Sequence, residues 1–375
     1  ENMAEKTGKR VFIASMRAGM GHVKAAEAVE MAVLNLNPQT AVKRLDLIDH
    51  SSAIIKYLYG KSYLDIVKKI PELYAYSYKN SRLTGNFIKP RQFFDRFHLR
   101  SFLKELKEFN PGVAVATHFI PAALFAYYRE KYDRDYKIIV SLTDYEIHPL
   151  WLIDGVDFYT VATEEMRYAM ELNGINPEKI LVTGIPIHPK FSRIRAKDEL
   201  RRNYGMGKKT TVLVSAGSFG LTPVDEAINF LSENVSGLEF LVVCGKTGKL
   251  QNELLAIQKY THELRYVFGF VDNMEELMGA CDVLITKPGG ITVSEALASG
   301  IPMILTDPIP GQEEANANFL VESGVAVKVA SLASMAYKLK NFGDSPEALS
   351  RMRLNAQKIS KPNAALDVAK LALEV

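Results

Sequence analysis

The feature that most constrains the fold is a regular alternation of short apolar runs with helical patterns along the sequence. Nearly continuous apolar runs of this kind are typical of parallel strands that helices cover on both faces. We expect twelve strands, at residues 10–15, 42–48, 113–117, 137–143, 158–162, 179–184, 210–216, 239–245, 265–270, 283–286, 302–306 and 325–329. Twelve strands in 375 residues predict an α/β protein with two doubly wound, Rossmann-like parallel-sheet domains rather than one domain.

The joint between these domains is expected at residues 184–200, a stretch rich in proline and charge that precedes a fresh series of strands and helices. The first domain is therefore predicted at 1–190, completed by a C-terminal helix at 361–375, and the second at 195–356. Open parallel sheets bind ligands at the carboxyl ends of their strands. Two sheets that face each other would place a site in the cleft between them.

The composition is that of a globular protein, with 47% hydrophobic and 24% charged residues. No apolar run reaches 18 residues, and the first ten residues lack the apolar core of a signal peptide, so we expect a cytoplasmic protein. Cys244 and Cys281 lie in apolar runs without CxxC or Cys/His spacing. This pattern predicts buried, reduced thiols and no metal site.

Positive charge and aromatic residues gather together in residues 51–107, which hold 12 Lys/Arg against 4 Asp/Glu. Helices that lie on an anionic membrane surface have this composition. Two amphipathic core helices with solvated charged faces are the alternative explanation. The segment matches no nucleic-acid-binding module, so no nucleic-acid partner is expected.

Four loops in the second half follow apolar strands and carry glycine or polar residues, at 215–223, 267–274, 288–297 and 310–317. A helix that begins on Gly289 and Gly290 offers unpaired backbone N–H groups to an anion. Taken singly, each loop is also explained by ordinary strand–helix turn chemistry.

In the first half, "SMRAGMGHVKAAEA" (15–28) follows the first strand and opens a helix. It fails as a dinucleotide fingerprint because Lys24 stands where the third glycine belongs, and it lacks the GxxxxGK of a P-loop. The loop instead places His22 at a helix start, where it is a candidate general base. Asp144, after the strand at 137–143, is the second candidate. A helix cap or structural hydrogen bond is the alternative for His22.

Taken together, "GMGHVKAAEA", "TDYEIHPLW", "VTGIPIHPKF", "KPGGITVSEALASGIPMI" and "PGQEEANA" resemble GT-B glycosyltransferases of family 28. The similarity is to bacterial diacylglycerol glucosyltransferases and plant monogalactosyldiacylglycerol synthases, and it spans nearly the whole chain. It implies the GT-B fold, with two Rossmann-like domains facing a cleft. It also implies a hexosyltransferase that moves glucose or galactose from a UDP-sugar to diacylglycerol with inversion, forming a β-linked glycolipid.

The resemblance also implies a role for each matching residue. The diphosphate would be held by Gly217, Ser218, Phe219, Gly220, Gly289, Gly290, Ile291 and Thr292. Uracil would lie against Phe268, Gly269, Phe270 and Val271, the ribose on Glu295, and the sugar on Gln312, Glu313 and Asn316. His22 and Asp144 would be the catalytic residues, and the acceptor would contact Gly19, Met20, Gly21, His148, Pro149 and Trp151.

The same resemblance implies no cofactor and no essential metal, since backbone N–H groups and helix dipoles would neutralise the leaving UDP. It places the enzyme at the inner face of the cell membrane, bound peripherally through residues 51–107. Three alternatives stay open: another acceptor lipid, either polyprenyl-linked or a glycosylated diacylglycerol; a UDP-sugar epimerase of the same architecture; and a UDP-sugar sensor without turnover.

Overall fold

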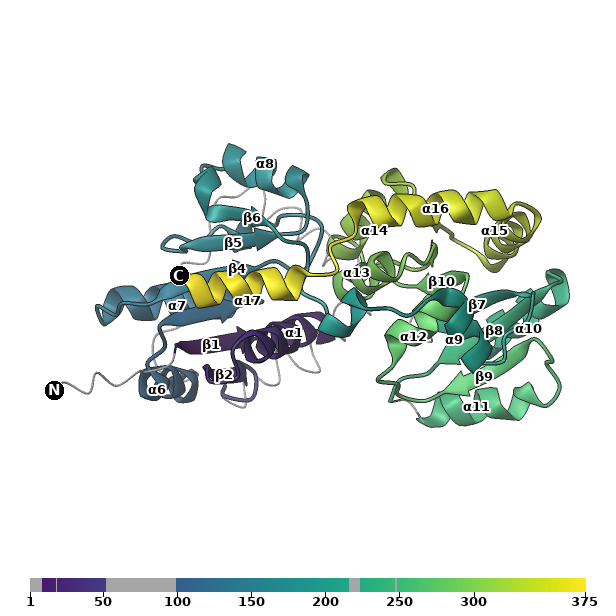
Figure 1. The fold of residues 1–375 in the computed structure, drawn as a ribbon, viewed down its shortest axis with the longest axis horizontal. Coiled ribbons are helices and arrows are strands. Elements are labelled where there is room, and N and C mark those ends of the chain that lie inside the picture. The colour runs from purple at the N-terminus through teal and green to yellow at the C-terminus, as the bar shows by residue number, and fades with distance from the viewer. Residues whose placement is uncertain (1–8, 18, 52–98, 216–222, 247) are drawn as a thin grey trace. The chain divides into compact units, whose positions relative to one another are not determined.

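The computed structural model describes residues 9–17, 19–51, 99–215, 223–246 and 248–375, which form two compact units. Unit 1 comprises Glu1–Pro189, Pro310–Gln312 and Pro362–Val375, and unit 2 comprises Lys190–Ile309 and Glu313–Lys361. In the described residues each unit has one six-stranded sheet, and every strand pair is parallel (Figure 1). The prediction of two doubly wound parallel sheets is therefore confirmed.

Unit 1 is built on a sheet with the strand order β2-β1-β3-β4-β5-β6. Its strands are β1 (Arg10–Ser15), β2 (Ala41–Asp46), β3 (Val113–Ala116), β4 (Lys137–Ser141), β5 (Phe158–Val161) and β6 (Ile180–Val182). Its helices are α1 (Met20–Leu36), α6 (Arg100–Phe109), α7 (Phe119–Lys131), α8 (Glu164–Leu172) and α17 (Ala364–Glu374), with short 3₁₀ turns η1 (Pro149–Trp151) and η2 (Pro177–Lys179).

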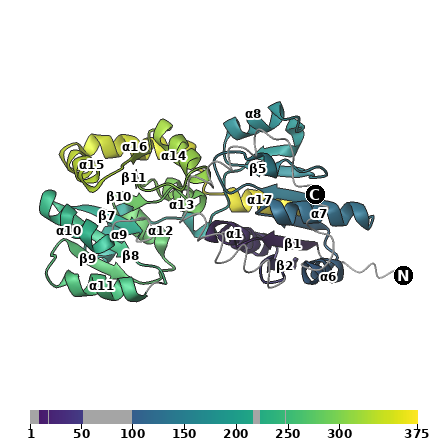
Figure 2. The same ribbon diagram turned by 180° about the vertical axis from the view of Figure 1, so that it is seen from behind.

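The last helix of the chain, α17, belongs to unit 1 and lies beside α1, as Figures 1 and 2 show from opposite sides. Alanines on both helices are buried at this contact, among them Ala28 and Ala32 on α1 and Ala369 and Ala372 on α17. Such small side chains let the two helices come close. The chain thus returns to its first sheet after the second sheet has been built.

Unit 2 has the strand order β12-β11-β10-β7-β8-β9. Its strands are β7 (Thr210–Ser215), β8 (Leu238–Val243), β9 (Leu264–Phe268), β10 (Val283–Thr286), β11 (Met303–Leu305) and β12 (Ala326–Lys328). Its helices are α9 (Lys197–Asn203), α10 (Val224–Asn234), α11 (Gly248–Gln258), α12 (Met274–Ala280), α13 (Gly290–Ser299), α14 (Gln312–Glu322), α15 (Leu332–Asp344) and α16 (Pro346–Ile359), after a 3₁₀ turn η3 (Pro189–Ser192). Both cysteines are buried and free, as predicted.

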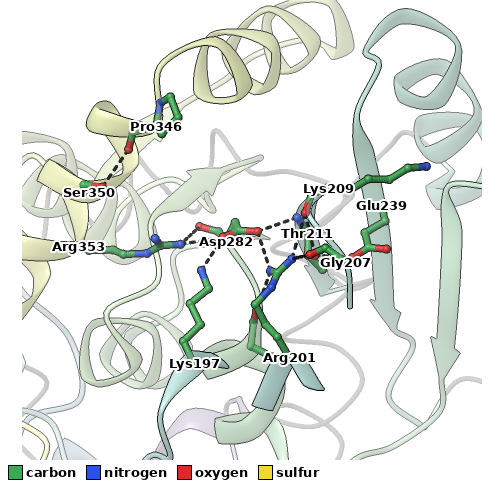
Figure 3. Close-up of polar contacts among 11 residues, drawn as sticks. Lys197, Arg201, Gly207, Lys209, Thr211, Glu239, Asp282, Pro346, Ser350 and Arg353 are labelled. Carbon is green, nitrogen blue, oxygen red and sulfur yellow. Dashed lines mark hydrogen bonds and ion pairs between the residues drawn. The ribbon is translucent and has the colours of Figure 1, made fainter. Parts of the chain in front are cut away.

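One carboxylate, that of Asp282, joins three distant parts of unit 2 at the amino end of β10 (Figure 3). It pairs with Lys197 and Arg201 of α9 and with Arg353 of α16, the two arginine contacts measuring 3.0 and 3.1 Å. It also accepts the backbone N–H of Thr211 in β7 at 2.9 Å. Because the candidate binding loops lie at the opposite, carboxyl edge of the sheet, this cluster is structural.

The basic, aromatic segment at 51–107 lies largely outside the described residues, and only 51 and 99–107 can be placed. Residues 100–107 belong to α6, in which Phe102 and Leu106 are fully buried. The Phe102 ring lies 5.7 Å from that of Phe12 and 6.0 Å from that of Phe125. The apolar side of this amphipathic helix completes the core, as the alternative of a core helix with a solvated charged face predicts for residues 100–107.

Within the described ranges, no helix combines the length and the apolar character needed to cross a membrane.

Candidate active site

One candidate site lies where the chain reverses direction in the sheet of unit 1. β1 lies between β2 and β3, so the chain builds the sheet to one side of β1 first and to the other side afterwards. Open α/β sheets bind ligands at the carboxyl ends of the strands at such a switch point. There the first turn of α1 brings His22, and the residues directly after β3 are Thr117 and His118.

Hydrogen bonds fix the tautomer of His22. Its Nδ1 lies 2.7 Å from the carbonyl oxygen of Thr117 and 2.9 Å from Oγ1 of Thr143. A carbonyl oxygen can only accept, so Nδ1 carries the proton and Nε2 carries the lone pair. The Thr117 hydroxyl donates to the backbone carbonyl of His22 at 2.8 Å and holds the same turn of α1 in place. His22 is thereby set to accept a proton at Nε2.

Burial keeps the His22 ring neutral near pH 7. Burial lowers its pKa below the ordinary 6.5, against the opposing effects of the Asp144 carboxylate, the Thr117 carbonyl and the Asp46 carboxylate. Asp144 follows β4, and Asp46 ends β2, where it accepts from Ser15 Oγ at 3.0 Å. The two carboxylates favour the imidazolium that His22 becomes when it takes a proton.

His118 is a residue of this edge that sequence reasoning missed. It is buried, and its ring centroid lies 4.7 Å from that of His22. It also packs against Phe119 and Trp151, at 4.3 and 6.2 Å between centroids. The available signal was its place directly after an apolar strand in "VAVATHF", the same kind of place that drew attention to Asp144.

The residues predicted to contact the acceptor fall into two groups. Trp151 is 2% exposed, and its ring lies 6.4 Å from that of His22. His148 is buried and caps η1, its Nδ1 accepting the Leu150 N–H at 3.2 Å.

Residues Gly19–Gly21, together with His22, form the start of α1. The Met20 side chain is 56% exposed there. A Cβ on Gly19 would meet no atom of the described residues within 4 Å, so none of them requires a glycine at this position.

A second candidate site is the carboxyl edge of the sheet in unit 2, where the switch point falls between β7 and β10. The loop after β10 leads into α13, and the loop after β7 includes the predicted phosphate-binding residues Gly217, Ser218, Phe219 and Gly220. Those four lie outside the described residues.

Among the described residues, nothing requires residue 289 to be glycine. It is the N-cap of α13 with φ −70° and ψ 132°, an ordinary conformation for any residue, and no side chain caps the helix. A Cβ added to it would meet only Glu313 Oε1, at 3.9 Å. A helix start with uncapped N–H groups and an unneeded glycine is suited to the close approach of an anion. Gly311 differs, because its φ of 99° requires glycine.

Gly289→Ala is expected to leave unit 2 folded and to weaken UDP binding by roughly 5- to 150-fold, because a ligand resting on the backbone would meet the new methyl group, at a cost of roughly 1–3 kcal/mol. Calorimetric titration with UDP measures the effect. Gly343→Ala is the control, since a Cβ there meets nothing within 4 Å. Wild-type affinity in Gly289→Ala would show that no ligand approaches this backbone.

The other residues assigned to the phosphates and ribose lie on α13 itself. Gly290, Ile291 and Thr292 form its first turn, and Thr292 is partly exposed. Glu295 lies one turn further on and is 7% exposed. A carboxylate so deeply buried on a helix that starts at the candidate site is unusual for a surface position.

The start of α14 carries the residues assigned to the sugar. Glu313 Oε2 accepts the Ile309 N–H at 2.8 Å, which places its carboxylate over the loop that precedes α14. Asn316 is fully buried and donates from Nδ2 to the Pro288 carbonyl at 3.0 Å. Asn316 thus braces the loop before α13. Gln312 is the first residue of α14.

The stretch assigned to uracil follows β9. The carbonyls of Phe268 and Gly269 accept the N–H groups of Cys244 and Gly245 from the end of β8, at 2.9 and 3.2 Å. The Phe270 ring is 64% exposed, and Val271 is partly buried. Lys246 Nζ, which the sequence reasoning did not single out, lies 5.3 Å from the centroid of Phe270. The exposed Phe270 ring offers a flat apolar surface at this edge.

Among the described residues, no group of three or more His, Cys, Asp or Glu side chains is arranged to hold a metal ion.

Two family models match successive parts of the chain. Residues 22–187 match the monogalactosyldiacylglycerol (MGDG) synthase model, and residues 197–359 match the model for glycosyl transferases group 1. These matches fall on the two parallel sheets.

The chain is 31% identical to the processive diacylglycerol beta-glucosyltransferase of Bacillus cytotoxicus, over 97% of this chain and 93% of that protein. Among solved structures it resembles Acinetobacter baumannii MurG, with a TM-score of 0.61 and 14% identity over 98% of this chain and all of that one. It also resembles UDP-GlcNAc 2-epimerase from Neisseria meningitidis, with a TM-score of 0.59 and 12% identity over 98% of this chain and all of the other. At such identities the structural likeness shows the fold alone.

The family resemblance drawn from the sequence motifs is confirmed by these matches. With parallel sheets of the GT-B type and nearly full-length similarity to a glucosyltransferase, the chain is a glycosyltransferase that belongs to the processive diacylglycerol β-glucosyltransferase family.

Proposed function

We propose that the protein transfers a hexose from a UDP-sugar to the free hydroxyl of diacylglycerol, with inversion, to form a β-glycosyl-diacylglycerol. Diacylglycerol as acceptor is supported by the name of the full-length relative and by the MGDG synthase match over unit 1. Glucose is the favoured sugar, because the relative that matches both units is a glucosyltransferase. Galactose is the alternative that the experiment below separates.

The observation that carries the proposal is the tautomer of His22. With Nδ1–H held by the Thr117 carbonyl, Nε2 is the atom that accepts the proton of the acceptor hydroxyl. The oxygen then attacks C1 of the sugar on the face opposite UDP. The new C1–O bond forms as the bond from C1 to the phosphate oxygen breaks, and its electron pair leaves with UDP. One such displacement converts an α-linked donor into a β-linked product.

Asp144 supports His22 rather than replacing it in this scheme. Its carboxylate raises the pKa of His22, so it stabilises the imidazolium formed during proton transfer. The exposed Met20 offers apolar surface near His22, which suits an acyl-chain-bearing acceptor, and the buried Trp151 ring packs beside His22.

The donor half is assigned to unit 2, apart from Gln312, which belongs to unit 1 and donates from Nε2 to Asp144 Oδ2 at 3.2 Å. The N-terminus of α13, with Gly289 and Gly290, is suited to the diphosphate, because its N–H groups and helix dipole stabilise negative charge on the leaving group. Glu295 is assigned to the ribose hydroxyls, Phe270 to uracil, and Gln312 and Glu313 to the sugar. Asn316 supports this arrangement by bracing Pro288.

Turnover is expected to persist after treatment with EDTA, because backbone N–H groups rather than a metal ion would neutralise the departing UDP. The rate of UDP release before and after EDTA, and after dialysis against added Mg²⁺, measures this. Loss of activity that Mg²⁺ restores would contradict a metal-independent mechanism.

Peripheral binding to an anionic membrane at the cytoplasmic face is proposed for the part of segment 51–107 that precedes α6. It is supported by the basic and aromatic composition of that part and by a lipid acceptor. In α6 the apolar side chains Phe102 and Leu106 are buried in the core, so they are not available to insert into such a surface.

The function is tested by supplying UDP-glucose or UDP-galactose with diacylglycerol in anionic mixed vesicles. UDP release is followed, and the lipids are separated by thin-layer chromatography. A glycolipid from one donor confirms the class and identifies the sugar. UDP binding without a lipid product from either donor would overturn diacylglycerol as acceptor and favour another lipid or a sensor. Isomerised UDP-sugar would favour an epimerase.

A further inference from the structure

Two imidazoles meet at the switch point of unit 1, and only one of them enters the mechanism above. The rings of His22 and His118 lie 4.7 Å apart between centroids and are nearly perpendicular, at 86°. His118 directly follows Thr117, whose carbonyl and hydroxyl both hold His22. Two consecutive residues after β3 therefore contact the proposed base: Thr117 through hydrogen bonds and His118 through its ring.

His118 has the opposite tautomer to His22. The backbone N–H of Ile120 donates to its Nδ1 at 3.1 Å, so Nδ1 is unprotonated and the ring proton is on Nε2. Burial, and next the neighbouring His22, hold the pKa of His118 well below 6.5. His118 is thus neutral at working pH, and its protonation would give up the hydrogen bond that caps α7.

We propose that His118 is a positioning residue for His22: a neutral imidazole of fixed tautomer that holds the His22 ring with Nε2 available and lies beside it as it gains charge. The inference rests on the proposed function, in which His22 is the base. The ring limits rotation of His22 about the Nδ1 hydrogen bond. A neutral aromatic neighbour accommodates an imidazolium, whereas a second charged histidine would repel it.

Capping α7 is the competing role for His118, and two substitutions separate the roles. His118→Asn keeps an acceptor for the Ile120 N–H, because asparagine is a good N-cap, but it removes the ring. His118→Phe keeps an aromatic ring but removes the acceptor. A residue that only caps the helix would tolerate asparagine and not phenylalanine, and a positioning ring would show the reverse in catalysis.

The pH dependence of His22 gives a readout that a capping role does not move. The charged groups that act on His22 are Asp144 after β4 and Asp46 of β2. Arg17 pairs with Asp49 at 2.6 Å and lies 4.0 Å from Asp46. All of these stay in place when His118 is replaced. Loss of the His118 ring exposes His22 to water, so its pKa is expected to rise toward 6.5 and the acid limb of kcat/KM to move to higher pH.

The experiment combines kinetics with NMR titration of isotope-labelled histidines in the free, full-length protein. His22 and His118 are assigned by substitution among the seven histidines. We expect His118→Asn to keep the wild-type Tm and KM, to lose about tenfold in kcat, and to raise the pKa of His22. We expect His118→Phe to lower Tm by a few degrees and to keep most of kcat. Ser331→Asn, at the N-cap of α15, controls for a cap exchange away from the site.

Wild-type kcat and unchanged His22 titration in His118→Asn would overturn the inference. If that variant does not fold, the wild-type spectrum decides: His118 with the proton on Nδ1, or titrating near pH 6.5, would also overturn it. Both NMR readouts are independent of turnover. Absence of any glycolipid from the wild-type enzyme would therefore count against the proposed function, while the tautomers still test the relation between the two histidines.

Discussion

His22→Ala is expected to lower kcat for glycolipid formation by about 10²–10⁴-fold, the usual contribution of a general base. Affinity for UDP should be unchanged, because the residues assigned to UDP belong to unit 2 and His22 belongs to unit 1. The tautomer is the reason for placing the largest catalytic effect here: only Nε2 of His22 is set to accept a proton. Initial rates with vesicle-borne diacylglycerol and titration with UDP measure the two quantities.

Asp144→Ala is the informative companion, because His22 and Asp144 are the two candidates for the base. If Asp144 acts through His22, its loss should have a smaller effect on kcat and should move the acid limb of kcat/KM to lower pH, since the carboxylate raises the pKa of His22. His262→Ala, a substitution of an exposed histidine in unit 2, should behave as wild type. Retained transfer in the double variant at His22 and Asp144 would refute the mechanism.

Asp282→Asn is expected to have the largest effect on stability, lowering the unfolding free energy of unit 2 by about 3 kcal/mol at neutral pH. The asparagine is nearly isosteric but leaves Lys197, Arg201 and Arg353 facing one another without their carboxylate. This figure is at the lower end of the stability loss expected when a buried ion pair is broken, because the Asp282 side chain keeps 18% exposure. For a unit of this size the loss corresponds to a Tm lower by roughly 6–12 °C.

The same carboxylate gives a pH signature. Burial acts to raise the pKa of Asp282, but the pairing with Lys197, the Thr211 N–H and the charge of Arg201 outweigh it, so the folded-state pKa lies below 3.8. A lowered folded-state pKa means that the stabilisation is complete above pH 3.8 and is lost as the pH falls through the lower value. Asp282→Asn should lack this part of the acid dependence.

Calorimetry measures the melting of both units, and Trp151 fluorescence follows unit 1 alone, because the only tryptophan is buried there. Glu253→Gln, which removes an exposed partner of Lys249, is the control and should change stability by less than about 0.5 kcal/mol. An Asp282→Asn protein with the wild-type melting profile would show that the three cations need no carboxylate.

The sequence alone determined the secondary structure and the class of the protein. All twelve predicted strands are present, most within two residues at each end, because buried parallel strands leave continuous apolar runs that turn residues interrupt. The glycine loops and the position of His22 were also visible, since helix starts after strands have their own local chemistry. The motifs in these loops identified the family.

Only the tertiary structure decided which residues far apart in the sequence come into contact, because these contacts depend on the order of the strands in each sheet. The Thr117 carbonyl and the Thr143 hydroxyl that fix the His22 tautomer lie 95 and 121 residues away from it. His118 reaches His22 only because β3 pairs with β1. The burial of one side of α6 also depends on the tertiary structure. So does the difference between Gly311, whose φ requires glycine, and Gly289, whose backbone conformation does not. Local patterns record what a residue's sequence neighbours require, whereas a side chain's partners depend on which strands become neighbours in the sheet.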